Sequence, residues 1–136
     1  MQILYIGAGF VGACSAAVSA DSGHQVLVYD VDEQKIAQLG TFDRDIIEGC
    51  LFEKGLGDLL VRNKERIEFV ADYEKVKVRL DSVDAIFLCL PTPEIGETGE
   101  SNLSYYMQAL STLAPHLKAR VGGAQSNHVV LINKST

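Results

Sequence analysis

The sequence has few of the features that mark membrane-bound, secreted or nucleic-acid-binding proteins. No apolar run approaches the roughly 20 residues of a membrane-spanning helix. The first residues carry neither a basic leader nor a cleavage site for secretion. Lys and Arg total 12 against 18 for Asp and Glu, which gives a net charge of −6, and no basic run exceeds two residues. Because binding to a phosphate backbone needs clustered Lys and Arg, we expect no nucleic acid and no membrane among the partners.

Cysteine is scarce as well, and its placement bears on compartment and metal binding. The three cysteines, Cys14, Cys50 and Cys89, are odd in number and far apart in the sequence. That pattern fits a reducing cytoplasm better than a disulfide framework. No Cys or His pair has the spacing of metal ligands. We therefore expect three buried thiols, no metal site and a cytoplasmic location.

Short apolar runs, rich in Val and Ile, recur along the 136 residues, of which 47% are hydrophobic. They lack polar alternation, which is typical of strands covered on both faces. Segments with helical spacing separate them. This alternation predicts one α/β domain, a Rossmann-type doubly wound parallel sheet with three layers, α/β/α. The expected strands are 2–6, 25–29, 67–70, 85–90 and 128–133, and the clearest helices are 10–20, 33–39 and 103–117.

Two connections stand out between these elements. Residues 40–57 form a stretch longer than a connection needs, and we expect a long functional loop there. Residues 92–102 are polar, acidic and contain glycine, so we expect them to be exposed. Gly23 follows the first predicted helix and is suited to cap its carboxyl end.

The stretch IGAGFVG holds three glycines between the first predicted strand and the first predicted helix. A G-x-G-x-x-G pattern in that context indicates a dinucleotide-binding turn. Gly7 would make the turn, Gly9 would let the pyrophosphate approach, and Gly12 would let the helix pack on the strand. The free amides of the helix start would face the anion. The predicted cofactor-binding residues here are Gly7, Gly9, Phe10, Val11 and Gly12, against the alternative of a glycine-rich turn that binds nothing.

Asp30 ends the second predicted strand, 18 residues after Gly12. A carboxylate there can accept hydrogen bonds from both hydroxyls of the adenosine ribose. It would repel the 2′-phosphate of NADP, and no Arg follows it, so the sequence favours NAD. A solvated strand-end residue is the alternative. Lys35, on the next helix, either reaches the same ribose or lies in solvent.

Taken in order, the motifs resemble those of the NAD-binding domain of the UDP-glucose/GDP-mannose dehydrogenase family. The resemblance covers essentially the whole chain, and within the family it is nearest to the UDP-glucose 6-dehydrogenases. The segment from Leu51 to Leu60 is far more specific than the glycine turn. The motifs that carry the resemblance are IGAGFVG (6–12), VYDVDEQKIAQL (28–39), LFEKGLGDLL (51–60), LCLPTP (88–93), NLSYY (102–106) and NKST (133–136).

Three positions depart from the family pattern. Phe10 and Phe52 stand where the family has Tyr, and Lys54 stands where it has Pro. Phe52 removes a hydroxyl from the 51–60 segment, and Lys54 removes some of its stiffness. Phe10 removes a hydroxyl beside the cofactor, with little expected harm because the family uses mainly backbone amides there. None of these changes removes a residue essential to NAD binding. The roles of Glu53 and Lys54 stay open.

The resemblance also implies roles near the nicotinamide. Thr92 would lie by the nicotinamide-side ribose. The alternative for this segment is that its proline only ends the buried strand and binds nothing. Ser135 would approach the nicotinamide, and Thr136 would help to position a catalytic water. None of the cysteines matches the family's nucleophile motif. We therefore expect residues 1–136 to be the NAD-binding part of a longer, homo-oligomeric dehydrogenase, without its central helix and UDP-sugar domain.

The family's reaction, as the resemblance implies it, oxidises the C6 alcohol of a nucleotide sugar to a carboxylate with two NAD. A Cys thiolate forms covalent intermediates, because a second hydride can leave only from a tetrahedral adduct. This chain should bind NAD but not turn over alone. Two alternatives remain: the NAD-binding domain of a 6-phosphogluconate or 3-hydroxyacid type dehydrogenase, and a stand-alone, non-enzymatic NAD-binding module. Which nucleotide sugar is the partner cannot be read from these residues.

Overall fold

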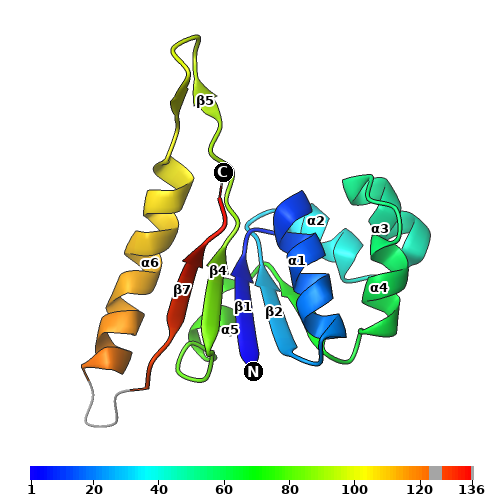
Figure 1. Cartoon of the computed structure of the whole chain (residues 1–136), viewed down its shortest axis with the longest axis horizontal. Coiled ribbons are helices and arrows are strands. Elements are labelled where there is room, and N and C mark those ends of the chain that lie inside the picture. The colour runs from blue at the N-terminus through cyan, green and yellow to red at the C-terminus, as the bar shows by residue number, and fades with distance from the viewer. Residues whose placement is uncertain (123–126, 136) are drawn as a thin grey trace.

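A five-stranded parallel sheet forms the middle of the molecule, a computed structural model that describes residues 1–122 and 127–135 (Figure 1). The strand order is β3-β2-β1-β4-β7, so the chain starts at the centre, winds outward on one side and then returns to fill the other. This is the predicted doubly wound arrangement. The strands are β1 (Gln2–Ile6), β2 (Gln25–Tyr29), β3 (Ile67–Val70), β4 (Ala85–Leu88) and β7 (Val130–Asn133).

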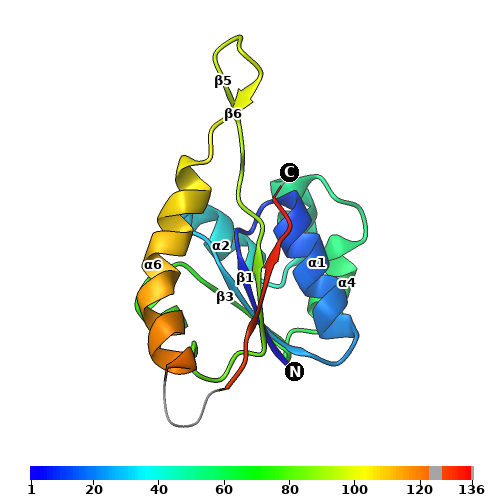
Figure 2. The ribbon, with the colours of Figure 1, turned by 60° about the vertical axis from the view of Figure 1, so that its left-hand side comes forward.

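Helices cover both faces of the sheet, which gives the three layers that the alternation predicts (Figure 2). Right-handed crossovers in opposite directions along the sheet place their helices on opposite faces. One layer consists of α1 (Phe10–Asp21), α2 (Glu33–Leu39), α3 (Arg44–Leu51) and α4 (Leu56–Arg62), and the other of α5 (Tyr73–Lys77) and α6 (Ser104–Val121). Within the described residues, no helix is both long and apolar enough to cross a membrane.

The core is divided by the sheet into two apolar clusters. Successive residues of a strand point to opposite faces, so Tyr5 joins the cluster under α1 while Leu4 joins the one under α5 and α6. The Tyr5 ring stacks on Phe87 with 4.6 Å between centroids, and its hydroxyl lies 2.8 Å from Ser19 Oγ. The two central strands are thereby held in register below the glycine turn.

The prediction of a long loop at 40–57 is wrong, because most of these residues lie in α3 and at the start of α4. The Asp43 carboxylate accepts hydrogen bonds from the amides of Asp45 and Ile46, which starts α3. Glu48 then accepts a bond of 3.0 Å from the amide of Gly55 and closes the turn before α4. The 51–60 segment, which resembles the family more specifically than the glycine turn does, therefore contributes to the contact between α3 and α4.

Residues 92–102 are exposed, as expected, and they form a projecting arm rather than a plain loop. The arm contains a small antiparallel hairpin of β5 (Glu94–Ile95) and β6 (Glu100–Ser101) that extends beyond the sheet and α6 (Figure 1). Strand β4 stops at Leu88, and β7 begins only at Val130, so both are shorter than the apolar runs predicted.

Candidate dinucleotide-binding site

A hollow of about 500 Å³ lies at the carboxyl ends of β1, β2 and β4. The chain winds in opposite directions from β1 and from β4, so this is the point where open α/β sheets bind their ligands. The glycine turn, the end of β2, the residues that follow β4 and the residues that follow β7 supply its walls. Four segments that are distant in the sequence thus meet at one edge of the sheet.

Gly7 and Gly12 give the glycine turn its shape. Gly7 has φ +104°, and its amide donates a hydrogen bond of 2.8 Å to the carbonyl oxygen of Tyr29. A side chain on Gly7 would collide with the carbonyl of Cys89, and one on Gly12 would collide with the carbonyl of Gly7. Gly12 is buried beneath the hollow and does not line it. Both residues therefore do what the motif predicts of them, a tight turn and close helix packing.

Gly9 differs from Gly7 and Gly12, because no atom of the described residues lies within 4 Å of the place a Cβ would take. It precedes α1, whose first turn has no side-chain cap and no acidic residue. The free amides and the positive end of the helix dipole favour an anion at such a position. Phe10 and Val11 line the hollow beside it. The open space at Gly9 is therefore a place for an anionic group.

Asp30 follows β2 and faces the glycine turn. Its Oδ2 accepts a hydrogen bond of 2.7 Å from the amide of Ala8, and its Oδ1 accepts one of 2.9 Å from the amide of Asp32. Only 13% of the side chain is exposed. Because a carboxylate has about four acceptor positions, the group retains capacity for a ligand. Asp30 thus also holds the glycine turn in place, which the sequence did not reveal.

Lys35 lies at the rim of the same hollow rather than in free solvent. Its Nζ is 3.5 Å from Asp30 Oδ2 and 3.8 Å from Asp32 Oδ2. Asp32 starts α2 by accepting a hydrogen bond of 3.0 Å from the Lys35 amide. The rim is therefore a small cluster of two carboxylates and one cation.

The opposite wall comes from the ends of β4 and β7. Ser135 Oγ accepts a hydrogen bond of 3.0 Å from the Leu90 amide and lies 3.2 Å from the Leu88 carbonyl oxygen, to which it donates. Ser135 lines the hollow, but Thr92 does not. Thr136 lies outside the described residues.

Cys89, Tyr105 and Lys134 also line the wall, although the prediction from sequence assigned none of them a role in the site. They come from the end of β4, the start of α6 and the end of β7, which meet only in the folded chain. Each lies in a segment that resembles the family (88–93, 102–106 and 133–136), and that resemblance is the one signal that could have found them. Lys134 adds a second cation to the site, opposite Lys35.

The cysteines have no activated thiol among them. Burial raises the pKa of the Cys89 thiol, although the Lys134 cation offsets part of the effect. Burial also raises the pKa of Cys14 and of Cys50. The expectation of three buried thiols holds for Cys89 and is wrong for Cys14 and Cys50, which are half-buried in α1 and α3. Across residues 1–122 and 127–135, no group of three or more His, Cys, Asp or Glu could hold a metal ion.

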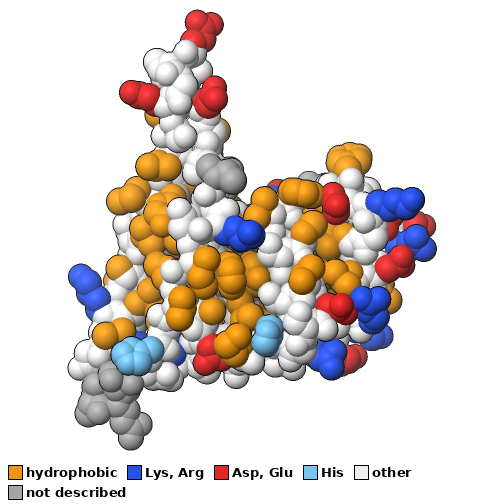
Figure 3. All heavy atoms as spheres, in the orientation of Figure 1, with side chains coloured by type: hydrophobic (Ala, Val, Ile, Leu, Met, Phe, Trp, Pro, Cys, Tyr) orange, Lys and Arg blue, Asp and Glu red, His pale blue; other side chains and the backbone are white. Residues whose placement is uncertain are grey.

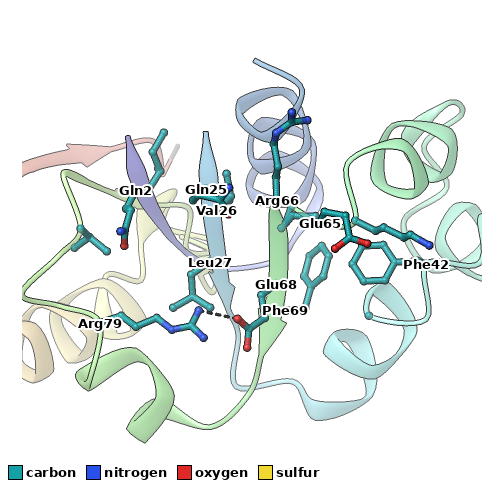
Figure 4. Close-up of a pocket in the computed structure, with 15 residues that line it drawn as sticks. Gln2, Gln25, Val26, Leu27, Phe42, Glu65, Arg66, Glu68, Phe69 and Arg79 are labelled. Atoms are coloured by element: carbon teal, nitrogen blue, oxygen red, sulfur yellow. Dashed lines mark ion pairs between the residues drawn. The ribbon is translucent and has the colours of Figure 1, made fainter. Parts of the chain in front are cut away.

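A second hollow, of about 490 Å³, lies at the opposite, amino ends of β1, β2 and β3 (Figure 4). Glu68 Oε2 and Arg79 Nη1 form an ion pair of 2.7 Å in its wall. The Phe42 and Phe69 rings pack 6.1 Å apart on another side. Among the described residues that line this space, none belongs to a glycine turn or a helix start of the α1 kind.

A parallel sheet of this order, with the glycine turn of α1 at its switch point, is a Rossmann-type dinucleotide-binding domain. The chain belongs to the UDP-glucose/GDP-mannose dehydrogenase family, and residues 1–136 match that family's NAD-binding domain. The members of this family are NAD-dependent oxidoreductases that act on nucleotide sugars.

The names of relatives within the family specify different nucleotide sugars. The chain is 32% identical to UDP-glucose 6-dehydrogenase TuaD of Bacillus subtilis, across 99% of this chain and 26% of the relative. It is 27% identical to UDP-N-acetyl-D-mannosamine dehydrogenase of Methanococcus vannielii, across 85% of this chain and 26% of the relative. The crystal structure of a ternary complex of GDP-mannose dehydrogenase from Pseudomonas aeruginosa superposes with a TM-score of 0.79 at 26% identity, across 100% of this chain and 28% of that one. The chain thus spans about a quarter of the length of the relatives it matches.

Proposed function

We propose that this chain is the part of a longer nucleotide-sugar dehydrogenase that holds NAD for hydride transfer. The observation that carries the proposal is the open, uncapped start of α1 at Gly9, which lies beside the Asp30 carboxylate. Family membership and the position of the hollow at the switch point support it.

Each part of the hollow suits one part of the dinucleotide. The pyrophosphate fits at Gly9, where the amides of Phe10 and Val11 are free to donate. The adenosine ribose fits at Asp30, with Lys35 at the rim. We assign the nicotinamide side to Ser135, and to Thr92 and Thr136 by their match to the family motifs. NAD, when bound, supplies the hydride acceptor.

We further propose UDP-glucose as the substrate of the whole enzyme. Its C6 alcohol would be oxidised to a carboxylate with two NAD. The UDP-glucose 6-dehydrogenase relative of B. subtilis supports this choice over the other sugars. In this proposal the remaining part of the enzyme contributes the sugar site and the nucleophilic Cys, and the whole enzyme is a homo-oligomer. Three free cysteines favour a reducing, cytoplasmic compartment.

Isothermal titration of NAD and NADP into the chain tests the cofactor assignment. We expect NAD to bind more tightly than NADP, because the Asp30 carboxylate repels a 2′-phosphate. Asp30→Ala should weaken NAD binding by at least about tenfold, which corresponds to one charged hydrogen bond of about 1.5 kcal/mol. Asp58→Asn, on the exposed start of α4, is the matched control and should leave the affinity unchanged.

Because Asp30 also holds the Ala8 amide, thermal melting must accompany the titration. A folded Asp30→Ala chain that has lost NAD supports the ribose role. Equal affinity for NAD and NADP, or no NAD binding by the folded parent chain, contradicts the assignment. NAD reduction by this chain alone with UDP-glucose would show that the chain needs no further part of the enzyme.

A further inference from the structure

Lys35 places a cation at the rim of the hollow, where the adenosine ribose would bind. A lysine ammonium group is a common ligand of phosphate. Within reach of the ribose it would attract the 2′-phosphate of NADP and so oppose the repulsion expected from Asp30. The charge of Lys35 must therefore be balanced if this site is to reject NADP.

Two carboxylates surround the Lys35 ammonium group. Its Nζ lies 3.5 Å from Asp30 Oδ2 and 3.8 Å from Asp32 Oδ2. The exposed fraction of the side chain is 13% for Asp30, 27% for Lys35 and 49% for Asp32. The cation thus lies between a carboxylate on the ribose side and a carboxylate nearer solvent, and the cluster as a whole is negative.

Asp30 cannot balance Lys35 and bind the ribose with the same acceptor positions. Its Oδ2 accepts a hydrogen bond from the Ala8 amide, and its Oδ1 accepts one from the Asp32 amide. Because a carboxylate has about four acceptor positions, two remain, and the two ribose hydroxyls would fill them. When the ribose is bound, Lys35 therefore needs another carboxylate.

Asp32 is placed to be that carboxylate. Its Oδ1 accepts a hydrogen bond of 3.0 Å from the Lys35 amide, which starts α2 and orients the side chain. Its Oδ2 faces Lys35 Nζ. The two residues are three apart at the start of one helix, so their side chains remain neighbours when the ribose site is occupied.

Few other groups near this rim could bind a 2′-phosphate. Val31, between the two carboxylates, lines the hollow with an apolar side chain that is 77% exposed. Among the described residues that line the hollow, the only other cation is Lys134, on the opposite wall. The arm at 92–102, which projects beyond the same end of the sheet, carries acidic side chains and neither Lys nor Arg (Figure 3). Discrimination against the phosphate at this rim therefore depends on Lys35.

We propose that Asp32 is a specificity-determining residue that keeps Lys35 from binding the 2′-phosphate of NADP, an inference that rests on the proposed NAD site. Asp30 repels the phosphate directly. Asp32 pairs with the one cation at the rim that could bind the phosphate. Without the charge of Asp32, Lys35 becomes a phosphate ligand.

Titration of NAD and NADP into Asp32→Asn tests this role. Asn is about as good a helix N-cap as Asp, so the variant removes the charge and keeps the start of α2. We expect NADP to bind at least about fivefold more tightly than to the parent chain, the effect of about one exposed ion pair. NAD affinity should change by less than about twofold, because its ribose hydroxyls carry no charge. Displacement of bound NAD measures NADP affinities that are too weak for direct titration.

Three further variants separate charge, cap and cation. Asp43→Asn is the matched control, since Asp43 starts α3 by the same kind of cap and does not line the hollow. It should leave both affinities unchanged. Asp32→Ser, a second uncharged cap, should show the same gain in NADP affinity as Asp32→Asn. Lys35→Met combined with Asp32→Asn should cancel most of the gain, because the gain depends on the ammonium group.

A salt series gives a readout that a purely structural role of Asp32 would not change. Salt screens an exposed ion pair, so NADP binding to Asp32→Asn should weaken as salt is added. In the parent chain salt screens the repulsion by the negative cluster instead, so NADP binding should weaken less.

Three outcomes overturn the inference. They are an unchanged ratio of NADP to NAD affinity in Asp32→Asn, an equal gain in Asp43→Asn, and a gain of the same size without Lys35. In each of them the parent chain still binds NAD, so the proposed function stands. A folded parent chain that binds no NAD contradicts the proposed function itself, and the role of Asp32 falls with it.

Discussion

The hollows at the two ends of the sheet have nearly the same volume, about 500 Å³ at the carboxyl end and about 490 Å³ at the amino end. Their walls differ in what they leave unpaired. At the carboxyl end, α1 starts without a side-chain cap, and Asp30 keeps acceptor capacity. At the amino end, Glu68 bonds to Arg79, and Arg66 Nη1 donates to Asn63 Oδ1 at 3.4 Å. Unused hydrogen-bonding capacity, rather than size, therefore distinguishes the candidate site.

The direction of the strands explains the difference. In a parallel sheet, helix starts follow the carboxyl ends of the strands, so free amides and partial positive charge collect at that end. At the amino end, the helices finish, and the amides that follow them bond to their last carbonyls, as Ser22 and Gly23 do at the end of α1. Arg120 satisfies carbonyls of the neighbouring loops, because its guanidinium donates to those of Leu80, Val83, Asn127 and His128. Polar groups at this end bind each other.

Substitution of Arg120 has the largest expected effect on stability. It tests whether charged side chains at the amino end of the sheet stabilise the fold. Arg120→Met should lower the free energy of unfolding by about 3 kcal/mol, because it leaves buried carbonyls without donors. Urea denaturation measures the loss. Lys118→Met, on the exposed surface of the same helix turn, is the control and should change stability by less than about 0.5 kcal/mol. A similar small loss for both variants would contradict the role given to Arg120.

The next effect compares two glycines within helices. Gly12→Ala should destabilise the fold by about 2–3 kcal/mol, since the added methyl collides with the carbonyl of Gly7. Gly49, in α3, has no atom of residues 1–122 or 127–135 within 4 Å of its Cβ position. Gly49→Ala should therefore stabilise the chain by about 0.5–1 kcal/mol through helix propensity. Thermal melts of both variants measure the contrast. If both changed the melting temperature in the same direction, close packing at Gly12 would not be the cause.

The strands of the sheet and helices α1, α2 and α6 were predictable from sequence, whereas the short helices α3 and α4 and the contacts between distant segments were not. The apolar runs at β1, β2 and β3 were recognised, with their bounds, from lack of alternation alone. The α3–α4 pair was missed because Gly49, Gly55 and the charged residues around them obscure a short helical pattern.

The same limit applies to the candidate site. The glycine turn and Asp30 were found from their spacing. The bond between Asp30 and the Ala8 amide depends on the β1–β2 register, which sets Ile6 beside Tyr29. Lys134 joins the wall only because β7 pairs with β4. Tertiary pairing of this kind leaves no local signal in one sequence.

Gly9→Ala at the carboxyl end and Arg79→Gln at the amino end together test which hollow binds NAD. The added methyl contacts no atom in the described part of the chain, so the free energy of unfolding should not change, but the methyl occupies the space beside the free amides of α1. We expect NAD affinity to fall by about tenfold to a hundredfold, or about 1.4–2.7 kcal/mol. Arg79→Gln, in the amino-end hollow, should leave NAD affinity unchanged and cost at most about 1 kcal/mol of stability, because its ion pair is partly exposed. NAD affinity that responds to Arg79→Gln and not to Gly9→Ala would move the cofactor site to the other end of the sheet.

The smallest effect concerns alkaline pH at the carboxyl-end hollow. Burial raises the pKa of Cys89 in the folded chain above that of an unfolded cysteine, about 8.5. The folded chain therefore retains a proton that the unfolded chain releases, so this contribution to stability is complete below about pH 8.5 and is lost as the pH rises through the folded pKa. Cys89→Ala should flatten the decline of unfolding free energy with rising pH. The cysteine outside the hollow, in α3, supplies the comparison. Cys50→Ala should flatten the decline less, because burial is the main cause of the raised pKa at both thiols and Cys50 is only half-buried. Denaturation curves at a series of alkaline pH values measure both slopes, and a steeper decline in Cys89→Ala than in the parent chain would contradict the buried, protonated thiol.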